Sequence, residues 1–296
     1  MILKEHVEKA TNGRVQVTVY PSATMFATGA EEVQGCMSGM IQFGYMNINH
    51  LAAYDGRWNV LTAPGVLKGW EHMQKFVNSP IYKQLNDDLA KQTGARILYW
   101  GIHIPYGDIP WNTKRPLVTP QDWNGLKLRA APSDIQINAI KEFGANPVVL
   151  QTAEVLAALT QGVIDGGIIT PATAITAWSA KETCPYVTIP YGGWALTNMF
   201  VGFLVNEKWW NSLPKDIQDA ITKEIPATAR HHQDTVMAAS TKLLKEYEAV
   251  PTNTVTRLTE EQTLVWQHAL EKTVLPQIAQ KYKGEEIMKQ AKEYAP

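Results

Sequence analysis

The chain has 296 residues, a length that favours two domains or one large α/β unit with a sizeable core. Its 45% hydrophobic and 19% charged content is ordinary for a soluble globular protein, and the formal net charge of -1 provides no field that would attract nucleic acid or an anionic membrane. No stretch approaches a bilayer-spanning run of apolar residues, and the first residues lack the basic-then-apolar layout of a secretory signal.

The first hundred residues alternate helical and strand-like patterns. Residues 2–13 have helical spacing, and residues 14–20, RVQVTVY, alternate apolar and polar side chains and predict a strand. Residues 71–94 have helical spacing that ends at Gly94, a common helix-stop residue. Residues 95–102, ARILYWGI, predict the next strand.

The middle of the chain continues this alternation. Residues 125–131, GLKLRAA, and 147–151, PVVLQ, predict strands, and residues 132–144 between them have helical spacing that ends at Gly144. Strands that alternate with helices predict an α/β fold in which helices cover the sheets.

The segment QGVIDGGIIT, residues 161–170, reads as a helix end, a turn and a short apolar strand. Asp165 within it has three candidate roles, namely a catalytic acid, a metal ligand or a turn residue. An earlier segment, CMSGMIQFGYMN, has the same pattern with Gln42 in the place of Asp165. Because a helix-to-strand turn needs a short polar residue beside glycines, this internal repeat favours the turn.

The two segments match position by position, and the match extends upstream. GRVQVTVYPSATM matches GANPVVLQTAEV, so that each half of the chain carries one strand, helix and strand unit. Ligands of open α/β sheets bind beyond the carboxyl ends of the strands, which makes the residues at the two strand ends, Asn47 and Thr170, candidate ligand-binding residues. The matching positions are Gly39, Ile41, Gln42, Gly44 and Asn47 with Gly162, Ile164, Asp165, Gly167 and Thr170.

One element of the repeat is missing from the first half. In the second half, a strand at 125–131 and a helix precede the repeated unit, whereas the first half has the helix at 2–13 without such a strand. We therefore expect the first sheet to lack one strand, and we expect the natural protein to have a longer N-terminal region.

Sequence motifs of catalysis and of metal or nucleotide binding are absent. No histidine stands in an HExxH or paired-ligand spacing, and no GxSxG, P-loop or GxGxxG pattern occurs. His231 and His232 are adjacent, and we expect both to be solvated. Cys36 and Cys184 are far apart, and two half-buried free thiols are favoured over a disulfide. We expect no catalytic residue, no metal ligand and no cofactor.

Arg129 lies at the carboxyl end of the predicted strand at 125–131, just before a helix. A guanidinium at such a position can clamp a carboxylate with two parallel hydrogen bonds. The helix after Pro132 would direct its free N–H groups towards the same anion. The residues alone leave a second interpretation open, in which Arg129 is a surface arginine at a strand end.

Two connections rich in aromatic residues and prolines join the predicted lobes, IPYGDIPWNTKRP and PYGGWALTNMF. They contain either hinge and ligand-site residues or the side chains of ordinary crossover loops. The candidate residues in them are Tyr106, Asp108, Trp111, Trp194 and Asn198. Two crossings predict two lobes, residues 1–106 with 195–234 and residues 107–194 with 235–296.

Three segments resemble one family, the solute-binding proteins of tripartite ATP-independent periplasmic (TRAP) transporters in the DctP-like, dicarboxylate-binding group. The segment NTKRPLVTPQDWNGLKLRAAPSDIQINAIKEFGANPVVLQTAEVLAALTQGVIDGGIITP is similar to the central signature of that family. FLVNEKWWNSLPKDIQDAI is similar to the segment that follows, and TNGRVQVTVYPSATM to an early strand and turn. The resemblance covers nearly the whole chain.

The resemblance implies a two-lobed periplasmic-binding-protein-like fold with a hinge and a long helix, at 214–249, that spans both lobes. It implies a periplasmic protein, a monomer or weak dimer, that captures a small organic carboxylate in an interlobe cleft. The ligand is then delivered to TRAP membrane subunits without covalent chemistry. In that family the arginine of the GLKxR motif pairs with the ligand carboxylate, and this position is Arg129 here.

Two departures from the family bear on the ligand. Members often carry another arginine where this chain has Asp108 or Ile109, and the common DGxENP becomes DGGIITP. Both changes disfavour a dicarboxylate and favour a monocarboxylate, or a zwitterion whose cation meets Asp108. Two other functions remain as alternatives, an enzyme with Asp108 as acid or base and a ligand sensor for a signalling partner.

Overall fold

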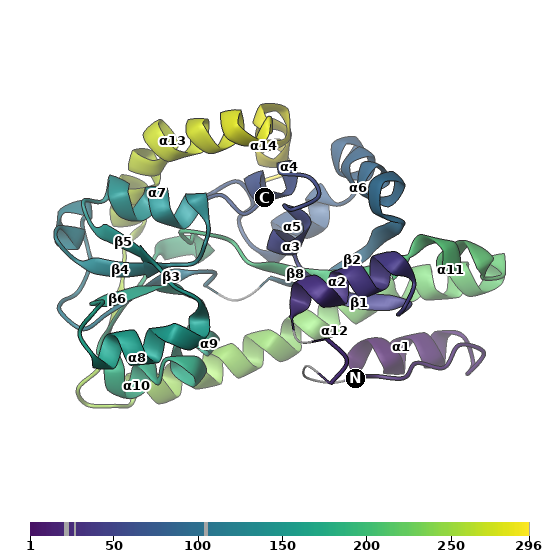
Figure 1. The fold of residues 1–296 in the computed structure, drawn as a ribbon, viewed down its shortest axis with the longest axis horizontal. Coiled ribbons are helices and arrows are strands. Elements are labelled where there is room, and N and C mark those ends of the chain that lie inside the picture. Colours follow the sequence, from purple (N-terminus) through teal and green to yellow (C-terminus); the bar gives the residue numbers. More distant parts are fainter. Residues whose placement is uncertain (21–23, 27, 104–105, 296) are drawn as a thin grey trace. The chain divides into compact units, whose positions relative to one another are not determined.

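The computed structural model describes residues 1–20, 24–26, 28–103 and 106–295 (Figure 1). The chain divides into two compact units. The first unit contains Met1–Asn59, Trp70–His103 and Phe200–Val236, and the second contains Val60–Gly69, Ile104–Met199 and Met237–Pro296. The bounds of these units differ from the predicted lobes, because Val60–Gly69, the stretch with Tyr106 and residues 195–199 belong to the second unit and residues 235–236 to the first.

The first unit has a three-stranded sheet of order β1-β8-β2. Both neighbours run antiparallel to the central strand β8. The strands are β1 (Phe43–Asn47), β2 (Ala95–His103) and β8 (Phe200–Asn206). The helices that begin in this unit are α1 (Ile2–Ala10), α2 (Gly29–Ser38), α3 (Ile48–Leu51), α4 (Arg57–Val60), α5 (Trp70–Phe76), α6 (Pro80–Thr93), α11 (Glu207–Ser212) and α12 (Lys215–Glu248).

The second unit has a six-stranded mixed sheet of order β5-β4-β6-β3-β7-β9. Helix α7 lies along one face of this sheet and the short helices α8 to α10 along the other (Figure 1). The strands are β3 (Ile109–Asn112), β4 (Lys127–Ala130), β5 (Asn146–Val149), β6 (Gly166–Ile169), β7 (Tyr186–Ile189) and β9 (Thr254–Arg257). The helices are α7 (Asp134–Glu142), α8 (Val155–Thr160), α9 (Pro171–Ala177), α10 (Ala180–Thr183), α13 (Glu260–Tyr282) and α14 (Glu285–Glu293), with short 3-10 turns at Pro120–Trp123, Thr152–Glu154 and Tyr191–Gly193.

Helix ends follow the local sequence. Helix α6 starts behind Ser79, whose side chain accepts a hydrogen bond from the amide of Tyr82, and it ends at Gly94 in the left-handed conformation. Gly144, just beyond α7, also has a positive φ. The predicted long helix is α12, which runs from Lys215 to Glu248 and contributes residues to both units. Among the described residues, no helix combines the length and the apolar character that crossing a membrane requires.

Residues 16–20 form no strand, contrary to the prediction for 14–20. Strand structure requires a neighbouring backbone, and the backbone of Val17 instead meets side chains of α1. Its carbonyl oxygen accepts a hydrogen bond from Lys4 Nζ at 2.8 Å, and its amide donates to Glu8 Oε1 at 2.8 Å. Residues 16–20, despite their alternating pattern, thus form an extended segment that pairs with no strand of the described structure.

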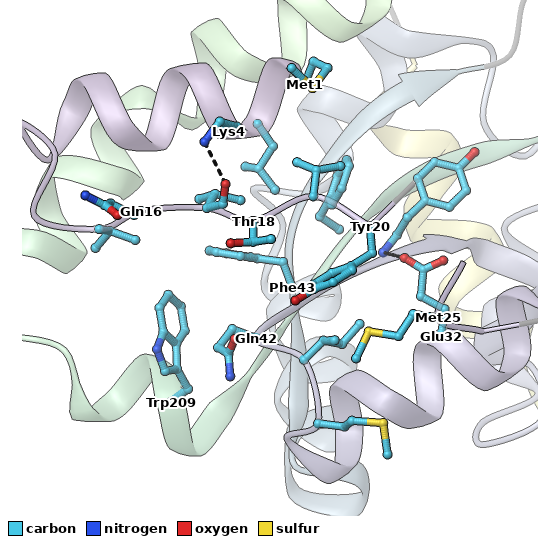
Figure 2. Close-up of a pocket in the computed structure, with 18 of the residues that line it drawn as sticks. Met1, Lys4, Gln16, Thr18, Tyr20, Met25, Glu32, Gln42, Phe43 and Trp209 are labelled. Atoms are coloured by element: carbon cyan, nitrogen blue, oxygen red, sulfur yellow. Dashed lines mark hydrogen bonds between the residues drawn. The ribbon is translucent and has the colours of Figure 1, made fainter. Parts of the chain in front are cut away.

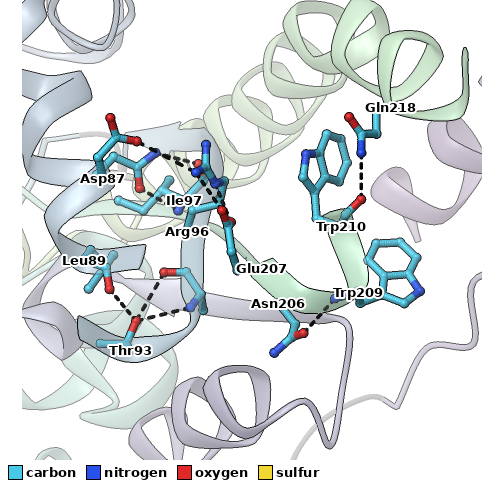
Figure 3. Close-up of polar contacts among 12 residues, drawn as sticks. Asp87, Leu89, Thr93, Arg96, Ile97, Asn206, Glu207, Trp209, Trp210 and Gln218 are labelled. Carbon is cyan, nitrogen blue, oxygen red and sulfur yellow. Dashed lines mark hydrogen bonds and ion pairs between the residues drawn. The ribbon is translucent and has the colours of Figure 1, made fainter. Parts of the chain in front are cut away.

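An ion pair, a helix cap and a hydrogen bond from α12 fix α11 at the end of the first sheet (Figure 3). Arg96 of β2 donates two hydrogen bonds to Glu207, at 2.5 and 2.8 Å. The side chain of Asn206 caps α11 by accepting a hydrogen bond from the amide of Trp209. Gln218 of α12 binds the carbonyl oxygen of Trp210 at 2.9 Å. These contacts hold the two tryptophans of α11 in place.

The two cysteines and one of the two adjacent histidines are more buried than the sequence predicted. Cys36 and Cys184 are free thiols, and both are buried rather than half-buried. His231 is exposed, but His232 is buried, because its ring stacks on Tyr99 and Phe203. Burial lowers the pKa of His232 to about 4, so that the ring is neutral at pH 7.

Candidate functional site

Arg129 lies on β4, in the interior of the second sheet between β5 and β6, and is only 2% exposed. Its guanidinium donates to the carbonyl oxygens of Leu150 and Ile168, at 3.0 and 3.1 Å. A third and longer contact, of 3.4 Å, reaches Thr152 Oγ1. These acceptors are neutral, and none of the ion pairs formed by the described residues involves Arg129.

The ring of Trp178 lies against the same guanidinium, whose carbon is 5.6 Å from the ring centroid. Burial lowers the pKa of Arg129, and the negative charge of Asp108 opposes that effect. A guanidinium carries five N–H donors, and the described contacts use only some of them. A buried cation with spare donors and no carboxylate partner is suited to binding an anion.

Asp108 is buried on the connection that leads into β3, where its backbone forms an isolated bridge with Thr197. Its Oδ2 accepts hydrogen bonds from Gln136 Nε2 at 2.8 Å and from Thr197 Oγ1 at 2.6 Å. Burial raises the pKa of this carboxyl, while Thr197, Arg129 and Gln136 oppose the rise. Asp108 thus acts on Arg129 through space, and no ion-pair contact joins the two.

The turn before Asp108 has an unusual backbone. Tyr106 and Gly107 have φ values of 67° and 52°, both in the left-handed region. A Cβ on Gly107 would lie 2.5 Å from Ala195 Cβ and 2.7 Å from the carbonyl oxygen of Thr197. Gly107 therefore permits the close approach of the two crossing segments, which places Asp108 beside Thr197.

The two glycines of β6 bring Arg129 close to its neighbours. A Cβ on Gly167 would lie 2.8 Å from Arg129 Cβ and 3.0 Å from the ring of Trp178. A Cβ on Gly166 would lie 2.0 Å from the carbonyl oxygen of Trp111. The glycine pair of the segment QGVIDGGIIT thus serves close packing around the arginine.

Asp165, which precedes these glycines, has a structural role. Its Oδ2 accepts a hydrogen bond from the amide of Lys127 at 2.9 Å, and its own amide donates to the carbonyl oxygen of Lys127 at 2.7 Å. These bonds join the start of β6 to the start of β4. The turn interpretation of Asp165 is confirmed.

Thr170 follows β6 and is the N-cap residue of α9. It is 5% exposed, and its hydroxyl forms a hydrogen bond of 3.0 Å with the hydroxyl of Thr173. β6 also supplies the carbonyl oxygen of Ile168 that holds Arg129. The structure thus brings Arg129, Asp108 and Thr170 into one region of the second unit, at the carboxyl ends of β4 and β6.

The other predicted site residues have contacts within the fold. Asn47 lies in the first unit and caps α3 by accepting a hydrogen bond from the amide of Asn49. Trp111 is fully buried in the second core, where its indole donates to the carbonyl oxygen of Ile169 and packs edge-on against Tyr247. Their roles in ligand binding stay predictions.

The remaining three candidates also belong to the second unit. Tyr106 packs against its hydrophobic core. Trp194 is 5% exposed and packs against Trp266, and the Asn198 side chain donates to the carbonyl oxygen of Leu67 at 2.8 Å. These contacts are structural, and a contribution of the three to ligand binding stays a prediction.

Sequence reasoning missed two residues of the site. Gln136, 3% exposed on α7, joins three segments, because its Nε2 binds Asp108 and Thr197 and its Oε1 accepts from the amide of Ala131. Trp178 lies just after α9, and its place in the sequence gives no sign that it contacts Arg129. A glutamine flanked by apolar residues on a helix was the one available signal for Gln136.

The described residues contain no cluster of three or more histidine, cysteine, aspartate or glutamate side chains that could hold a metal ion. The N–H groups of Arg129 are donors of the kind that electrostatic binding of an anion would use. A histidine, a cysteine or a serine beside a general base, which nucleophilic chemistry would use, is absent from the described contacts of Arg129 and Asp108.

Comparison with known proteins finds relatives that match most of the chain. The family model described as bacterial extracellular solute-binding protein, family 7 (DctP), matches residues 2–281. The C4-dicarboxylate-binding periplasmic protein DctP of Rhodobacter capsulatus is 25% identical over 279 residues, which cover 90% of this chain and 78% of that protein.

Solved structures have the same fold. A TRAP periplasmic solute-binding protein from Chromohalobacter salexigens with bound D-glucuronate has a TM-score of 0.82 at 20% identity, covering 99% of this chain and 94% of that one. Another from Sulfurospirillum deleyianum, with bound succinate, has a TM-score of 0.76 at 23% identity, covering 99% and 93%. Because the family model matches nearly the entire sequence, this chain belongs to the family of bacterial extracellular solute-binding proteins, family 7.

Proposed function

We propose that this protein binds a small organic carboxylate at Arg129 and delivers it, outside the cytoplasm, to the membrane subunits of a TRAP transporter. The observation that carries the proposal is the buried guanidinium of Arg129, whose described hydrogen bonds go to neutral oxygens only. The relatives support it, since the R. capsulatus protein is named for C4-dicarboxylate binding and the C. salexigens structure holds D-glucuronate. The family membership supports a binding role rather than an enzymatic one.

We further propose that the ligand carries one carboxylate rather than two. Asp108 and Arg129 are both buried and interact electrostatically. The negative charge of Asp108 would therefore repel an anion that binds to Arg129. One guanidinium compensates one carboxylate, while a second carboxylate would need another cation. A zwitterion fits the same arrangement, because its cationic group has Asp108 as a partner.

The test is a thermal-shift screen of organic acids followed by calorimetry. The panel contains monocarboxylates such as D-glucuronate, dicarboxylates such as succinate, and zwitterionic amino acids. A ligand that binds only the folded protein raises the melting temperature by mass action. We expect at least one member of the panel to do so, with monocarboxylates or zwitterions ahead of dicarboxylates.

Substitutions of Arg129 test whether the ligand binds at this residue. Removing one partner of a buried charge pair costs about 2–5 kcal/mol of binding free energy, so we expect R129A to abolish detectable binding and R129K to weaken it severely. The matched control is Arg257→Ala, which removes an exposed arginine of the same unit that pairs with Glu248. Full affinity in R129A would exclude Arg129 from the site.

A further inference from the structure

Two histidines from distant parts of the sequence meet in the first unit. His6 lies on α1 and His231 on α12, and α1 packs against the first half of α12 (Figure 1). His6 Nε2 is 3.1 Å from His231 Nδ1, and the ring centroids are 5.4 Å apart. The two residues are 225 positions apart in the chain, so that the pair exists only through tertiary packing.

A carboxylate holds the other nitrogen of the His6 ring. His6 Nδ1 is 2.7 Å from Glu224 Oε1. Because the carboxylate oxygen accepts, His6 Nδ1 donates, and a neutral ring then has its lone pair on Nε2. Nε2 is the nitrogen that contacts His231. Glu224 and His231 lie about two turns apart on α12, and the His6 ring bonds to both.

The geometry of the two rings matches that of histidines bound to a first-row transition metal. A metal-binding histidine typically donates its second ring N–H to a carboxylate, which fixes the tautomer and makes the ligating nitrogen more basic. Zinc lies about 2.0–2.1 Å from a histidine nitrogen, so two nitrogens 3.1 Å apart subtend an angle of about 100° at the ion. That angle lies between the values of octahedral and tetrahedral coordination.

Packing and polar contacts fix the helix that carries His6. Val7 of α1 is buried in the same core cluster as Ile221 of α12. Lys4, also on α1, donates to the carbonyl oxygen of Val17 at 2.8 Å (Figure 2). A site on two packed helices has its ligating atoms in place before an ion arrives.

Solvent reaches the pair. His231 is exposed, and the side chain of His6 is 18% exposed. An ion can therefore approach the two nitrogens and keep water at its remaining coordination positions. The adjacent His232 does not belong to the pair, because it is buried and its Nδ1 is 3.2 Å from the hydroxyl of Tyr99.

The neighbouring charges favour a cation at the two nitrogens. Glu224 places a negative charge beside His6. Arg230 precedes His231 on α12, and its positive charge is compensated by Asp234, with 3.0 Å between Nε and Oδ1. A divalent ion between the rings is therefore attracted by the carboxylate that orients one of them.

We propose that His6 Nε2 and His231 Nδ1 bind one divalent transition-metal ion, with Glu224 as the positioning residue that orients His6. Imidazole suits zinc, nickel and copper, of which copper binds most tightly. With two protein ligands and water at the other positions, the site is open, unlike the closed four-ligand sites of structural zinc. The ion joins α1 to α12, so that its binding stabilises the first unit. The site shares no residue with the carboxylate site around Arg129.

Calorimetric titration with zinc chloride or copper chloride measures the affinity. The protein is full-length, carries no histidine tag and is treated with a chelator beforehand. We expect one ion per chain, with copper bound more tightly than zinc. Loss of an outer-shell partner of a metal site costs about 10–100-fold in affinity, so we expect the loss of a ligand, in His6→Ala or His231→Ala, to cost about tenfold or more.

His268→Ala is the matched control for the ligand variants. It removes an exposed histidine of α13, in the second unit, and we expect zinc affinity to stay unchanged. His231→Ala removes an exposed side chain, so the variant should fold normally, which its melting temperature without metal verifies. We expect zinc to raise the melting temperature of the original protein and of His268→Ala, but not that of His231→Ala.

Two variants of Glu224 separate orientation of His6 from direct metal binding. Glu224→Gln keeps an oxygen that accepts from His6 Nδ1 and loses the charge, so we expect zinc to bind several-fold more weakly. Glu224→Ala loses both, and we expect a loss of about 10–100-fold. NMR of the histidine ring nitrogens identifies the atoms involved. We expect zinc to shift His6 Nε2 and His231 Nδ1, and Glu224→Ala to weaken the preference for a proton on His6 Nδ1 in the metal-free protein.

Four results would overturn the proposal. The first is zinc binding weaker than a Kd of about 1 mM. The second is full zinc affinity in His231→Ala. The third is an equal loss of affinity in His231→Ala and His268→Ala, which would indicate scattered binding to surface histidines. The fourth is zinc binding that leaves the ring nitrogens of His6 and His231 unshifted, in which case the two rings share only a hydrogen bond.

Discussion

Asp108 and Arg129 illustrate how burial sets the properties of single residues in this protein. A carboxyl whose pKa is raised on folding binds more protons in the folded than in the unfolded state, between its ordinary pKa and the raised one. The contribution of Asp108 to stability is therefore greatest at low pH, and it falls as the pH rises through that window. The hydrogen bonds from Thr197 and Gln136 and the positive charge of Arg129 favour the ionised carboxylate and so oppose the rise in its pKa.

Asp108→Asn removes this titration and the negative charge beside Arg129. We expect the variant to gain stability relative to the original protein as the pH rises from about 4 to 7. A carboxylate ligand should bind about tenfold more tightly, equivalent to about 1.4 kcal/mol, because a like charge is gone. Urea unfolding across this pH range and calorimetry at pH 7 measure the two effects. A difference in unfolding free energy that does not change with pH would contradict the raised pKa.

At the scale of elements, two glycines, Gly166 and Gly167, allow β6 to pack closely against its neighbours. Gly167→Ala puts a methyl group 2.8 Å from Arg129 Cβ and 3.1 Å from its carbonyl oxygen. We expect a loss of about 1–3 kcal/mol of stability from overpacking, together with weaker ligand binding, because β4 and the guanidinium must shift. Denaturant unfolding and calorimetry measure both.

The matched control is Gly162→Ala, which lies in the same repeat motif. Gly162 has a φ of +69°, and its Cβ would meet nothing within 4 Å. This substitution strains only the backbone, at about 1 kcal/mol, and we expect ligand affinity to stay unchanged. Equal affinity losses in the two variants would show that the packing of Gly167 against Arg129 does not control binding.

The elements that could be predicted from the sequence are those with local causes. Helix ends at Gly94 and Gly144, the strands at 95–102 and 125–131, and the turn at Asp165 follow from residues within a few positions. The prediction of a strand at 14–20 was wrong, because a strand forms only where another strand, distant in the sequence, pairs with it. In the site, Arg129 could be singled out from its place at a strand end. Tertiary packing alone brings Gln136 to Asp108 and Trp178 to Arg129.

At the scale of the whole molecule, α12 connects the stability of the two units. Ile217, Ile221 and Ala229 of this helix belong to the core of the first unit, and Leu244 and Tyr247 belong to the core of the second. A helix of 34 residues forms cooperatively. We therefore expect a loss of packing at one end of α12 to weaken its packing at the other end.

Leu244→Ala tests this connection. Truncation of a buried leucine costs about 2–5 kcal/mol, and we expect it to lower the unfolding midpoints of both units together. Amide exchange in denaturant reports each unit separately, through β8 for the first and β4 for the second. Leu264→Ala on α13 is the control, because that side chain is 38% exposed and its loss should leave both midpoints nearly unchanged. A midpoint that falls in β4 while β8 stays fixed would show that the two units unfold independently despite their common helix.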